Sequence, residues 1–546
     1  MKLLMVVYDQ NSYCTFFPLG LAYLASAIRN AHPDVEIEVW QQDIYHYSDD
    51  ELTVKLDSDA FDIVMISVIG GLQQFQKLLS LSKAIDRCSY RKKLRYLIGG
   101  HGPAAAPQYY LQQTGADVCG IGEGEITLPE LVDVFKGKRD LSSVNGIAYI
   151  DDKSHFVMTS SRELISDIDS IAWPAWDLFD INYYAMYRFP NILPEERSMV
   201  MLTGRGCTFH CNFCYRMDQG FRPRSSVSII QEIKYLKEKY RIKYFYFADE
   251  LLMSSKERTM SLCRAMLDNE LNIHWWCNGR LNYVDDDVLA LMKEAGCVCI
   301  NYGIESLDSD SRRIMNKCLS DDMILNGVKK TLEFGITPAL NIIYGNIDEP
   351  LDALDKATQF LLEYDDHRDF HTIHFVAPFP GTELFNEAVR RGCIQDVADF
   401  YESKHVSYDL LTTNFTRHNR LDIYRKMYEA NSIIIKNHYE HLGRKHIENR
   451  YRTLREEIDV LTARREEYTE KIICLIHDAM PKEQEITLES NLKDDLGIDS
   501  MMMFRLLVDC EEQFDIRFDP AIDDLNEIFQ TVNSLLLAIE RKRDGD

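Results

Sequence analysis

The sequence is poor in positive charge and has no long apolar run. Its 546 residues include 61 Lys and Arg against 87 Asp and Glu, a formal net charge of −26. Nucleic acids and anionic membranes attract Lys and Arg, so this balance argues against both as general partners. Every apolar run is far shorter than the roughly 20 residues of a membrane helix, and the opening KLLMVVY lacks a signal-peptide layout. These absences predict a cytosolic protein that binds neither nucleic acid nor membrane.

A disulfide framework is not expected either. In a cytosolic chain of this size, the 14 cysteines are expected to be thiols, metal ligands or core residues. Eleven are scattered, and Cys207, Cys211 and Cys214 form a CxxxCxxC cluster. A hydrophobic fraction of 46% is enough for several cores. At about 150 residues per domain, the length predicts three or four domains.

Residues 1–140 alternate between strand-like and amphipathic helical stretches. The strand candidates are 2–8, 35–40, 62–68, 94–100 and 116–122. This alternation predicts an α/β domain with a doubly wound, Rossmann-like parallel sheet. Glycines gather after the late strands, where such sheets bind ligands. The same glycines are also typical of plain tight turns.

The rest of the chain divides into four segments. The irregular pattern of residues 141–195 predicts a linker that packs on both neighbouring domains. The pattern of residues 386–470 predicts a helical region, with a charged connector helix at 444–470. Residues 471–546 predict a small acidic helical bundle. Between them, 196–385 contain six further strand candidates with helical patterns in the gaps. Six such units predict a partial (β/α)6 barrel of the TIM type, with its active site on the loops after the strands.

The cysteine cluster directly follows the first predicted barrel strand. Three thiolates at this spacing can surround one metal centre. A closed zinc site would need a fourth ligand nearby, and none stands at finger-like spacing. A four-iron cluster with three protein ligands keeps one iron open for a small molecule. The pattern alone leaves a zinc site or a coincidence as alternatives.

In residues 196–385 the sequence resembles the radical S-adenosylmethionine (SAM) superfamily, whose signature is CxxxCxxC after the first strand with an aromatic, here Phe213, before the last cysteine. The resemblance implies a [4Fe-4S] cluster held by the three cysteines, with SAM chelated to its open iron. It also implies SAM contacts at later strand ends, each of which could instead be a structural ion pair. These are Asp249 and Glu250 for the amino group, in Ala-Asp-Glu rather than the commoner Gly-Gly-Glu, Arg280 for the carboxylate, and Glu305 for the ribose.

The first domain resembles the cobalamin-binding subgroup of this superfamily through FPLGLAYLASAIR (17–29), IGGHGP (98–103) and GIGEGEITLPEL (120–131). The implied cobalamin contacts are Ser67, Gly70, Gly99, Gly100, His101, Gly122, Glu123 and Gly124. The loop after the first strand, residues 9–14, lacks the histidine of the DxHxxG motif. We therefore expect cobalamin without that lower ligand, and His101 as a contact to its tail or a turn residue. A degenerate domain that binds nothing is the alternative.

Near the C-terminus, NLKDDLGIDS (491–500) resembles acyl and peptidyl carrier proteins, in which the serine of an Asp-Ser pair carries 4′-phosphopantetheine. The resemblance implies a four-helix carrier bundle over 471–546, modified at Ser500. An acidic surface also suits docking onto basic partner enzymes. The alternative is an ordinary serine that caps a helix.

Together these resemblances imply a cobalamin-dependent radical SAM enzyme of a natural-product pathway, with C-methylation of an acyl or aminoacyl substrate on the carrier as the favoured reaction. They also imply a phosphopantetheinyl transferase and a reductase, flavodoxin or ferredoxin as electron donor. Three alternatives stay open. The outcome could be radical cyclisation or rearrangement, the barrel could act on a free small molecule, or an inactive barrel could serve as a carrier or interaction protein.

Overall fold

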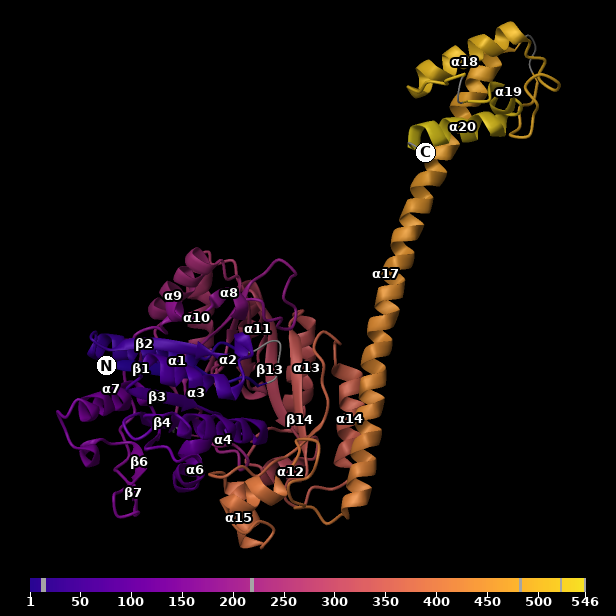
Figure 1. Ribbon diagram of the computed structural model, residues 1–546. Helices are drawn as coiled ribbons and strands as arrows, with labels where there is room; N and C mark the ends of the chain where they lie inside the picture. Colours follow the sequence, from indigo (N-terminus) through magenta and orange to yellow (C-terminus); the bar gives the residue numbers. More distant parts are fainter. Residues whose placement is uncertain (11–15, 217–219, 481–483, 521–522, 545–546) are drawn as a thin grey trace. The chain divides into compact units, whose positions relative to one another are not determined.

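The computed structural model describes residues 1–10, 16–216, 220–480, 484–520 and 523–544. The chain forms two compact units, Met1–His438 and Tyr439–Asp546 (Figure 1). Within the described ranges, no helix is long and apolar enough to cross a membrane. The loop after the first strand, for which the sequence predicts no cobalt-binding histidine, falls largely on residues 11–15 and so lies outside the described residues.

The first unit begins with a seven-stranded sheet of order β2-β1-β3-β4-β5-β6-β7, parallel from β2 to β5 and antiparallel beyond. Its strands are β1 (Lys2–Val7), β2 (Glu36–Gln41), β3 (Ile63–Ser67), β4 (Arg95–Gly99), β5 (Val118–Gly120), β6 (Ile147–Ile150) and β7 (Phe156–Met158). Its helices are α1 (Leu19–Ala31), α2 (Gln42–Tyr45), α3 (Asp49–Asp59), α4 (Leu72–Asp86), α5 (His101–Ala105), α6 (Pro107–Thr114) and α7 (Gly124–Phe135). The strand order reverses between β1 and β3, and such switch points bind ligands in doubly wound sheets.

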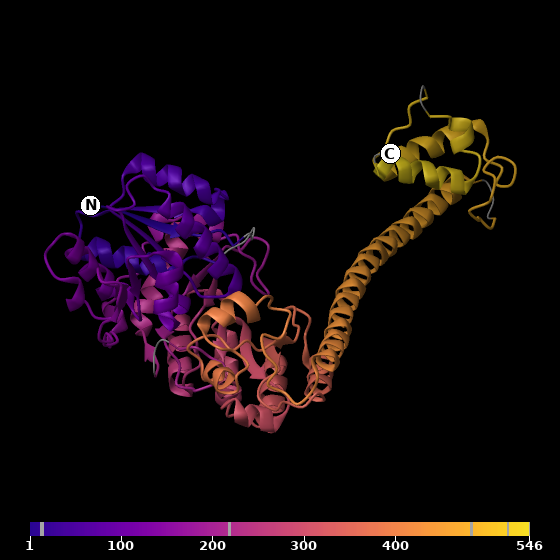
Figure 2. The same cartoon turned by 60° about the horizontal axis from the view of Figure 1, so that its bottom comes forward.

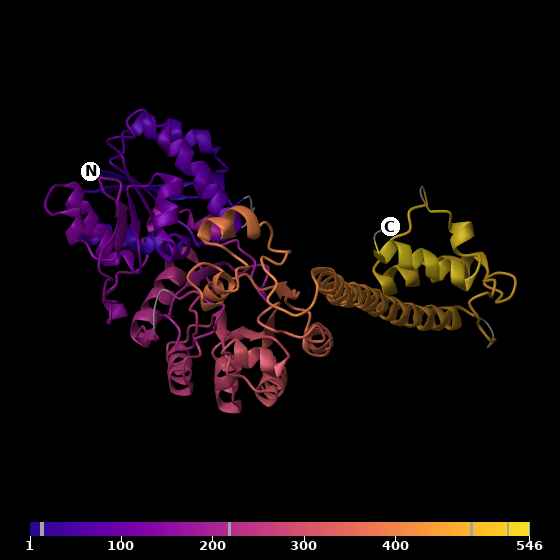
Figure 3. The same ribbon diagram turned by 90° about the horizontal axis from the view of Figure 1, so that it is seen from below.

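The second sheet of this unit contains six parallel strands in chain order: β8 (Ser198–Met201), β11 (Tyr244–Phe247), β12 (His274–Gly279), β13 (Cys297–Glu305), β14 (Thr337–Tyr344) and β15 (His374–Phe375). Between and after them come α9 (Ser226–Tyr240), α10 (Lys256–Asp268), α11 (Asp286–Glu294), α12 (Ser309–Ile314), α13 (Asp321–Glu333), α14 (Ala353–Tyr364), α15 (Glu383–Arg390) and α16 (Val397–Asp399). Figures 2 and 3 show this curved sheet with helices along its outer side. The prediction of a partial barrel is confirmed.

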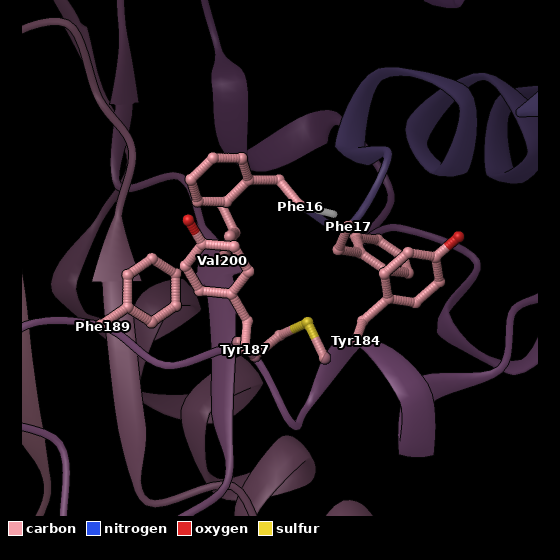
Figure 4. A pocket seen from close by; sticks show the side chains of 7 residues that line it. Phe16, Phe17, Tyr184, Tyr187, Phe189 and Val200 are labelled. Atoms are coloured by element: carbon pink, nitrogen blue, oxygen red, sulfur yellow. The ribbon is translucent and has the colours of Figure 1, made fainter. Parts of the chain in front are cut away.

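Trp176, in the segment between the two sheets, belongs to a core cluster that contains buried residues of both sheets. The Trp176 ring stacks on Phe17 at 4.6 Å, and its Nε1 donates to the buried carboxylate of Glu232 in α9 at 3.2 Å. Beside this contact, after α8 (Ile181–Tyr184), a small pocket opens among aromatic side chains (Figure 4). Its lining residues are Phe16, Phe17, Tyr184, Tyr187, Phe189, Met199 and Val200. The two sheets therefore share one continuous core.

The second unit is helical. Helix α17 (Arg420–Ala479) starts in the first unit, includes all of the connector predicted at 444–470, and supplies its last turns to a bundle with α18 (Ser500–Phe514), α19 (Leu525–Ile528) and α20 (Val532–Asp544). Ile472, Leu506 and Leu536 are fully buried in its core. The predicted four-helix bundle is confirmed.

Candidate active site and carrier site

The three clustered cysteines lie in the loop that follows β8 and the short strand β9 (Gly204–Arg205), which pairs with β10 (Arg222–Pro223). Burial raises the pKa of the Cys207 thiol, and that of Cys214 to about 11, and the nearby Glu250 carboxylate acts in the same direction on both. The Cys211 thiol also raises the pKa of both Cys207 and Cys214, so the three sulfurs lie close together. At neutral pH the Cys207 and Cys214 thiols hold their protons until a metal displaces them. Phe213 is half-buried against an adjacent apolar core.

Asn212, inside this loop, anchors it to the rest of the barrel. Its side chain is almost fully buried and exchanges two amide hydrogen bonds with Asn346, at 3.2 and 3.1 Å. Its backbone N–H donates to Met315 at 3.1 Å, and its carbonyl accepts from Leu384 at 2.9 Å. Nothing in the sequence around Asn212 indicates this role, and the one signal is that Asn346 stands just after β14.

The two acids after β11 have different surroundings. Asp249 is 1% exposed and accepts hydrogen bonds from both the backbone N–H (2.6 Å) and the hydroxyl of Thr203. Burial raises the pKa of its carboxyl. Glu250 is exposed and acts on the thiols of Cys207 and Cys214. Glu250 is therefore the acid that lies beside the cysteine loop, while Asp249 braces the end of β8.

Arg280 and Glu305, at the ends of β12 and β13, meet at Lys317. The Arg280 guanidinium lies 3.4 Å above the centre of the Phe209 ring and donates to the Lys317 carbonyl. The buried Lys317 ammonium pairs with Glu305 at 2.8 Å. Since Phe209 lies between the first two cysteines, this network adjoins the cysteine loop. Lys317 belongs to no motif, and nothing in the sequence pointed to it.

Glu349, in the turn after β14, is a buried acid of the same region. It accepts hydrogen bonds from the Gly345 and Asn346 N–H groups at 2.9 and 3.1 Å and from the Ser306 hydroxyl at 2.6 Å. Burial outweighs these bonds and raises the pKa of Glu349 from 4.5 to about 7. The Glu349 side chain thus holds the backbone that carries Asn346. At a pH above its raised pKa the buried carboxyl group is ionised, and this charge destabilises the fold.

This raised pKa predicts a pH-dependent stability. Between pH 4.5 and about 7 the folded state keeps a proton that the unfolded state has released, so the free energy of unfolding falls as pH rises through this window. The loss is at most about 3 kcal/mol. We expect the urea midpoint of the first unit to fall from about pH 5 to about pH 8, and to fall less in Glu349→Gln.

Tryptophan fluorescence can follow this unit alone. All tryptophans belong to it: Trp40, Trp173, Trp176, Trp275 and Trp276. The difference between the wild-type protein and the variant isolates Glu349 from other groups that titrate in the same range. Equal midpoint changes in the two proteins would contradict the assignment.

The loops after β3 and β4 of the first sheet approach each other as bare backbone. A Cβ added to Gly70 or to Gly102 would lie 2.5 Å from the other residue's Cα, and one added to Gly100 would lie 2.3 Å from the Val68 carbonyl. Gly70 and Gly100 have φ values of 111° and 96°, which strongly favour glycine. Ser67 ends β3 beside them.

Two other glycines at strand ends of this sheet leave open space beside the backbone. A Cβ at Gly122 would meet nothing within 4 Å, and one at Gly99 would only touch the Gly120 carbonyl at 3.8 Å. Backbone without side chains at strand ends is a surface on which a large, flat ligand can lie. The backbone at Gly99 and Gly122 therefore leaves room for the tail of the expected cobalamin.

The glycine loop after β4 also reaches the cysteine loop. His101 starts α5, and its ring lies 6.0 Å from that of Tyr215, edge to face. Tyr215 directly follows Cys214. The two predicted cofactor loops, which are far apart in the sequence, therefore meet in space through these two rings.

Glu123 and Gly124 have protein partners instead. The 7% exposed Glu123 accepts from the Ile165 N–H at 2.8 Å and pairs with Arg205 and Arg222 at 2.8 and 3.0 Å. Burial acts to raise its pKa, but these bonds hold it below the usual value. A Cβ at Gly124 would press on the Leu24 side chain at 2.6 Å. Glu123 thus joins the first sheet domain to its surroundings, whereas Gly124 packs against α1 within that domain. The sequence indicated neither role.

Ser500 is exposed and is the first residue of α18. Asp499 caps this helix, because its carboxylate accepts from the backbone N–H groups of Met501 and Met502, both at 2.9 Å. The alternative that Ser500 is the capping serine is therefore wrong. Met501 and Phe504, in the first turns of the same helix, are also exposed.

Comparison with known families matches three parts of the chain. Residues 6–132 match the B12 binding domain, 201–361 the radical SAM superfamily and 470–539 the phosphopantetheine attachment site. An uncharacterized methyltransferase of Pyrococcus horikoshii is 25% identical over 78% of this chain and 91% of its own. Cytidylyl-2-hydroxyethylphosphonate methyltransferase of Streptomyces wedmorensis is 24% identical over 71% of this chain and 80% of its own. An anaerobic magnesium-protoporphyrin IX monomethyl ester cyclase of Cereibacter sphaeroides is 25% identical over 68% of this chain and 60% of its own.

Solved structures share the fold. The cobalamin-dependent radical SAM enzyme OxsB, with aqua-cobalamin and SAM bound, superposes with a TM-score of 0.56 at 19% identity, over 72% of this chain and 55% of its own. The radical SAM methyltransferase TsrM of Kitasatospora setae, with cobalamin and a [4Fe-4S] cluster bound, superposes with a TM-score of 0.58 at 15% identity, over 78% of this chain and 81% of its own. This chain therefore contains a radical SAM domain, with a B12 binding domain before it and a phosphopantetheine attachment site after it.

Proposed function

We propose that this protein is a cobalamin-dependent radical SAM C-methyltransferase whose substrate is held on its own carrier domain. The observation that carries the proposal is the meeting of the glycine loop after β4 with the cysteine loop, through His101 and Tyr215. A methyl donor held by the first loop and a substrate activated beside the second would then be neighbours. Methyltransferases among the relatives support the reaction class.

Cys207, Cys211 and Cys214 are the proposed ligands of a [4Fe-4S] cluster. When bound, the cluster with SAM supplies one-electron chemistry for hydrogen abstraction, and cobalamin supplies the methyl group. The protein's part is to hold these groups in place and exclude water. Asn212 and Asn346 keep the cysteine loop in one conformation through their paired amides. These asparagines are positioning residues.

Glu250, Arg280 and Glu305 are the proposed SAM contacts. The exposed Glu250 carboxylate beside the thiols can pair with the SAM ammonium group. Arg280 offers a two-pronged donor to the SAM carboxylate, and Phe209 keeps its guanidinium plane in place. Glu305 can accept hydrogen bonds from the ribose hydroxyls while Lys317 orients it. Phe213 completes the apolar side of the loop.

Cobalamin is proposed to lie over the strand ends of the first sheet. Ser67 and Gly70 form the floor under the ring. Gly99, Gly100, His101 and Gly122 border the space for its tail. Gly70 and Gly100 are required for the loop itself, whereas Gly99 and Gly122 leave the open backbone that a ligand can cover. We propose supporting roles for Glu123, through its arginines, and for Gly124.

Ser500 is proposed to carry the 4′-phosphopantetheine arm and, through its thiol, an acyl or aminoacyl substrate. A phosphopantetheinyl transferase must install this arm. A reductase, flavodoxin or ferredoxin is the proposed electron donor. Because the carrier is covalently attached to the barrel, delivery is intramolecular and needs little intrinsic affinity.

Isotope transfer tests this function. A set of acyl and aminoacyl arms is loaded onto Ser500 from coenzyme A thioesters by a phosphopantetheinyl transferase. The reconstituted protein is then incubated anaerobically with SAM carrying a deuterated methyl group and a reductant. We expect the labelled methyl group in the mass spectrum of the Ser500 peptide.

Each other outcome contradicts part of the proposal. A mass change of the loaded arm without label would indicate cyclisation or rearrangement, an outcome consistent with the cyclase among the relatives. Absence of SAM cleavage, with the cluster present, would indicate a barrel that has lost its activity.

A further inference from the structure

A cluster of histidines and aspartates lies away from the proposed active site, between α14 and β15. The connecting segment reads DDHRDFH over 365–371, and His438 joins it from α17. The ligand atoms of Asp365, His367 and His438 all lie within 4.8 Å of one another. Asp365 is at the centre, because the imidazole of His371 faces its other oxygen.

The side chains of this cluster are withdrawn from water. Those of Asp365, His438 and His367 are 4%, 8% and 12% exposed. In the described part of the chain, the ion-pair partners of Asp365 are histidines, with no Lys or Arg among them. Burial of a carboxylate is costly unless positive charge compensates it, and a bound cation would supply that charge.

The distances in the cluster suit an ion better than direct hydrogen bonds. The Asp365 Oδ2 lies 3.4 Å from the His367 Nδ1 and 4.0 Å from the His438 Nδ1. Hydrogen bonds between such groups are about 2.7–3.2 Å long. Two ligands of one tetrahedral zinc ion, with bonds of about 2.0–2.2 Å, lie about 3.3–3.6 Å apart.

Local structure holds all three side chains in place. Asp365 caps the end of α14 and accepts from the His367 N–H at 3.0 Å, which keeps the turn closed. On α17, Asn431 exchanges two hydrogen bonds of 2.9 Å with the backbone of Ile373, just before β15. Asn431, the buried Ile434 and His438 are spaced by three and four residues, so they share one helix face.

From these contacts we propose that Asp365, His367 and His438 bind one zinc ion, which fastens α17 to the end of the half-barrel. Two imidazole nitrogens and a carboxylate oxygen form a ligand set that zinc favours. The Nε2 of His371, 4.0 Å from the Asp365 Oδ1 and 3.9 Å from the Asp369 Oδ2, lies beside the site. This site is independent of the cluster, SAM and cobalamin.

Zinc binding is tested in protein without a polyhistidine tag and with Cys207, Cys211 and Cys214 all changed to Ala, so that the empty cysteine loop cannot capture zinc. After zinc loading and gel filtration, we expect about one zinc ion per chain by elemental analysis. Asp365→Asn and His438→Ala should each weaken zinc binding by about 100-fold or more. His441→Ala, an exposed histidine of the same helix, is the matched control and should retain the ion.

Cobalt(II) titration of the protein with an intact Asp365 site gives a second measurement that does not depend on how the site variants fold. We expect the visible absorption of a four-coordinate ion without thiolate-to-metal bands. Absence of bound zinc and of this absorption overturns the proposal, as does zinc retained in folded His438→Ala. None of these results depends on SAM cleavage, so they are separable from failure of the proposed function.

Discussion

Replacing Cys207, Cys211 or Cys214 with Ala should abolish the iron–sulfur cluster and reduce SAM cleavage by at least about 1,000-fold, to background. Each thiol is proposed to hold one iron, and no other cysteine is close in sequence to replace it. The methyl side chain of alanine cannot coordinate iron, so a cluster left with only two cysteine ligands should be lost during gel filtration. Iron analysis, visible absorbance and product chromatography after anaerobic reconstitution measure the effect.

Cys474→Ala is the control for this loss. Cys474 is an exposed thiol of the second unit, so its removal should leave both cluster content and SAM cleavage at wild-type values. If all three single variants of the loop kept the cluster absorbance, the assignment of these cysteines as its ligands would fail.

Replacing Ser500 with Ala is expected to eliminate methylation of tethered substrates, because the hydroxyl that accepts the phosphopantetheine arm is gone. The helix itself should be unaffected, since Asp499 provides its cap. Intact-mass measurement after treatment with a phosphopantetheinyl transferase should show the arm on the wild-type protein and not on the variant. SAM cleavage without substrate, which needs only the cluster, is the internal control and should be unchanged.

The same variant separates delivery within the chain from a carrier that serves an outside synthase. Both ideas predict modification of Ser500, so modification alone cannot distinguish them. The deciding measurement is turnover of candidate substrates offered free in solution. If Ser500→Ala methylates a free substrate as fast as the wild-type protein, delivery by the attached carrier is refuted.

Sequence by itself determined the features that depend on local spacing. The alternation of strands and helices predicts both sheets, because apolar periodicity follows directly from how each element buries its face. CxxxCxxC after a strand and Asp-Ser before a helix are contiguous patterns, so they could be read without knowing what surrounds them. The strand ends also indicated where Arg280 and Glu305 lie, since parallel strands end at one edge of a sheet.

Only the tertiary structure decided which of these side chains face one another. Asp249 and Glu250 are adjacent in sequence, but Asp249 is buried against Thr203, and only the exposed Glu250 lies beside the thiols. Lys317 pairs with Glu305 across an intervening helix, and Asp365 approaches His438, which lies far along the chain. Such contacts depend on how helices and loops pack, which no local pattern encodes.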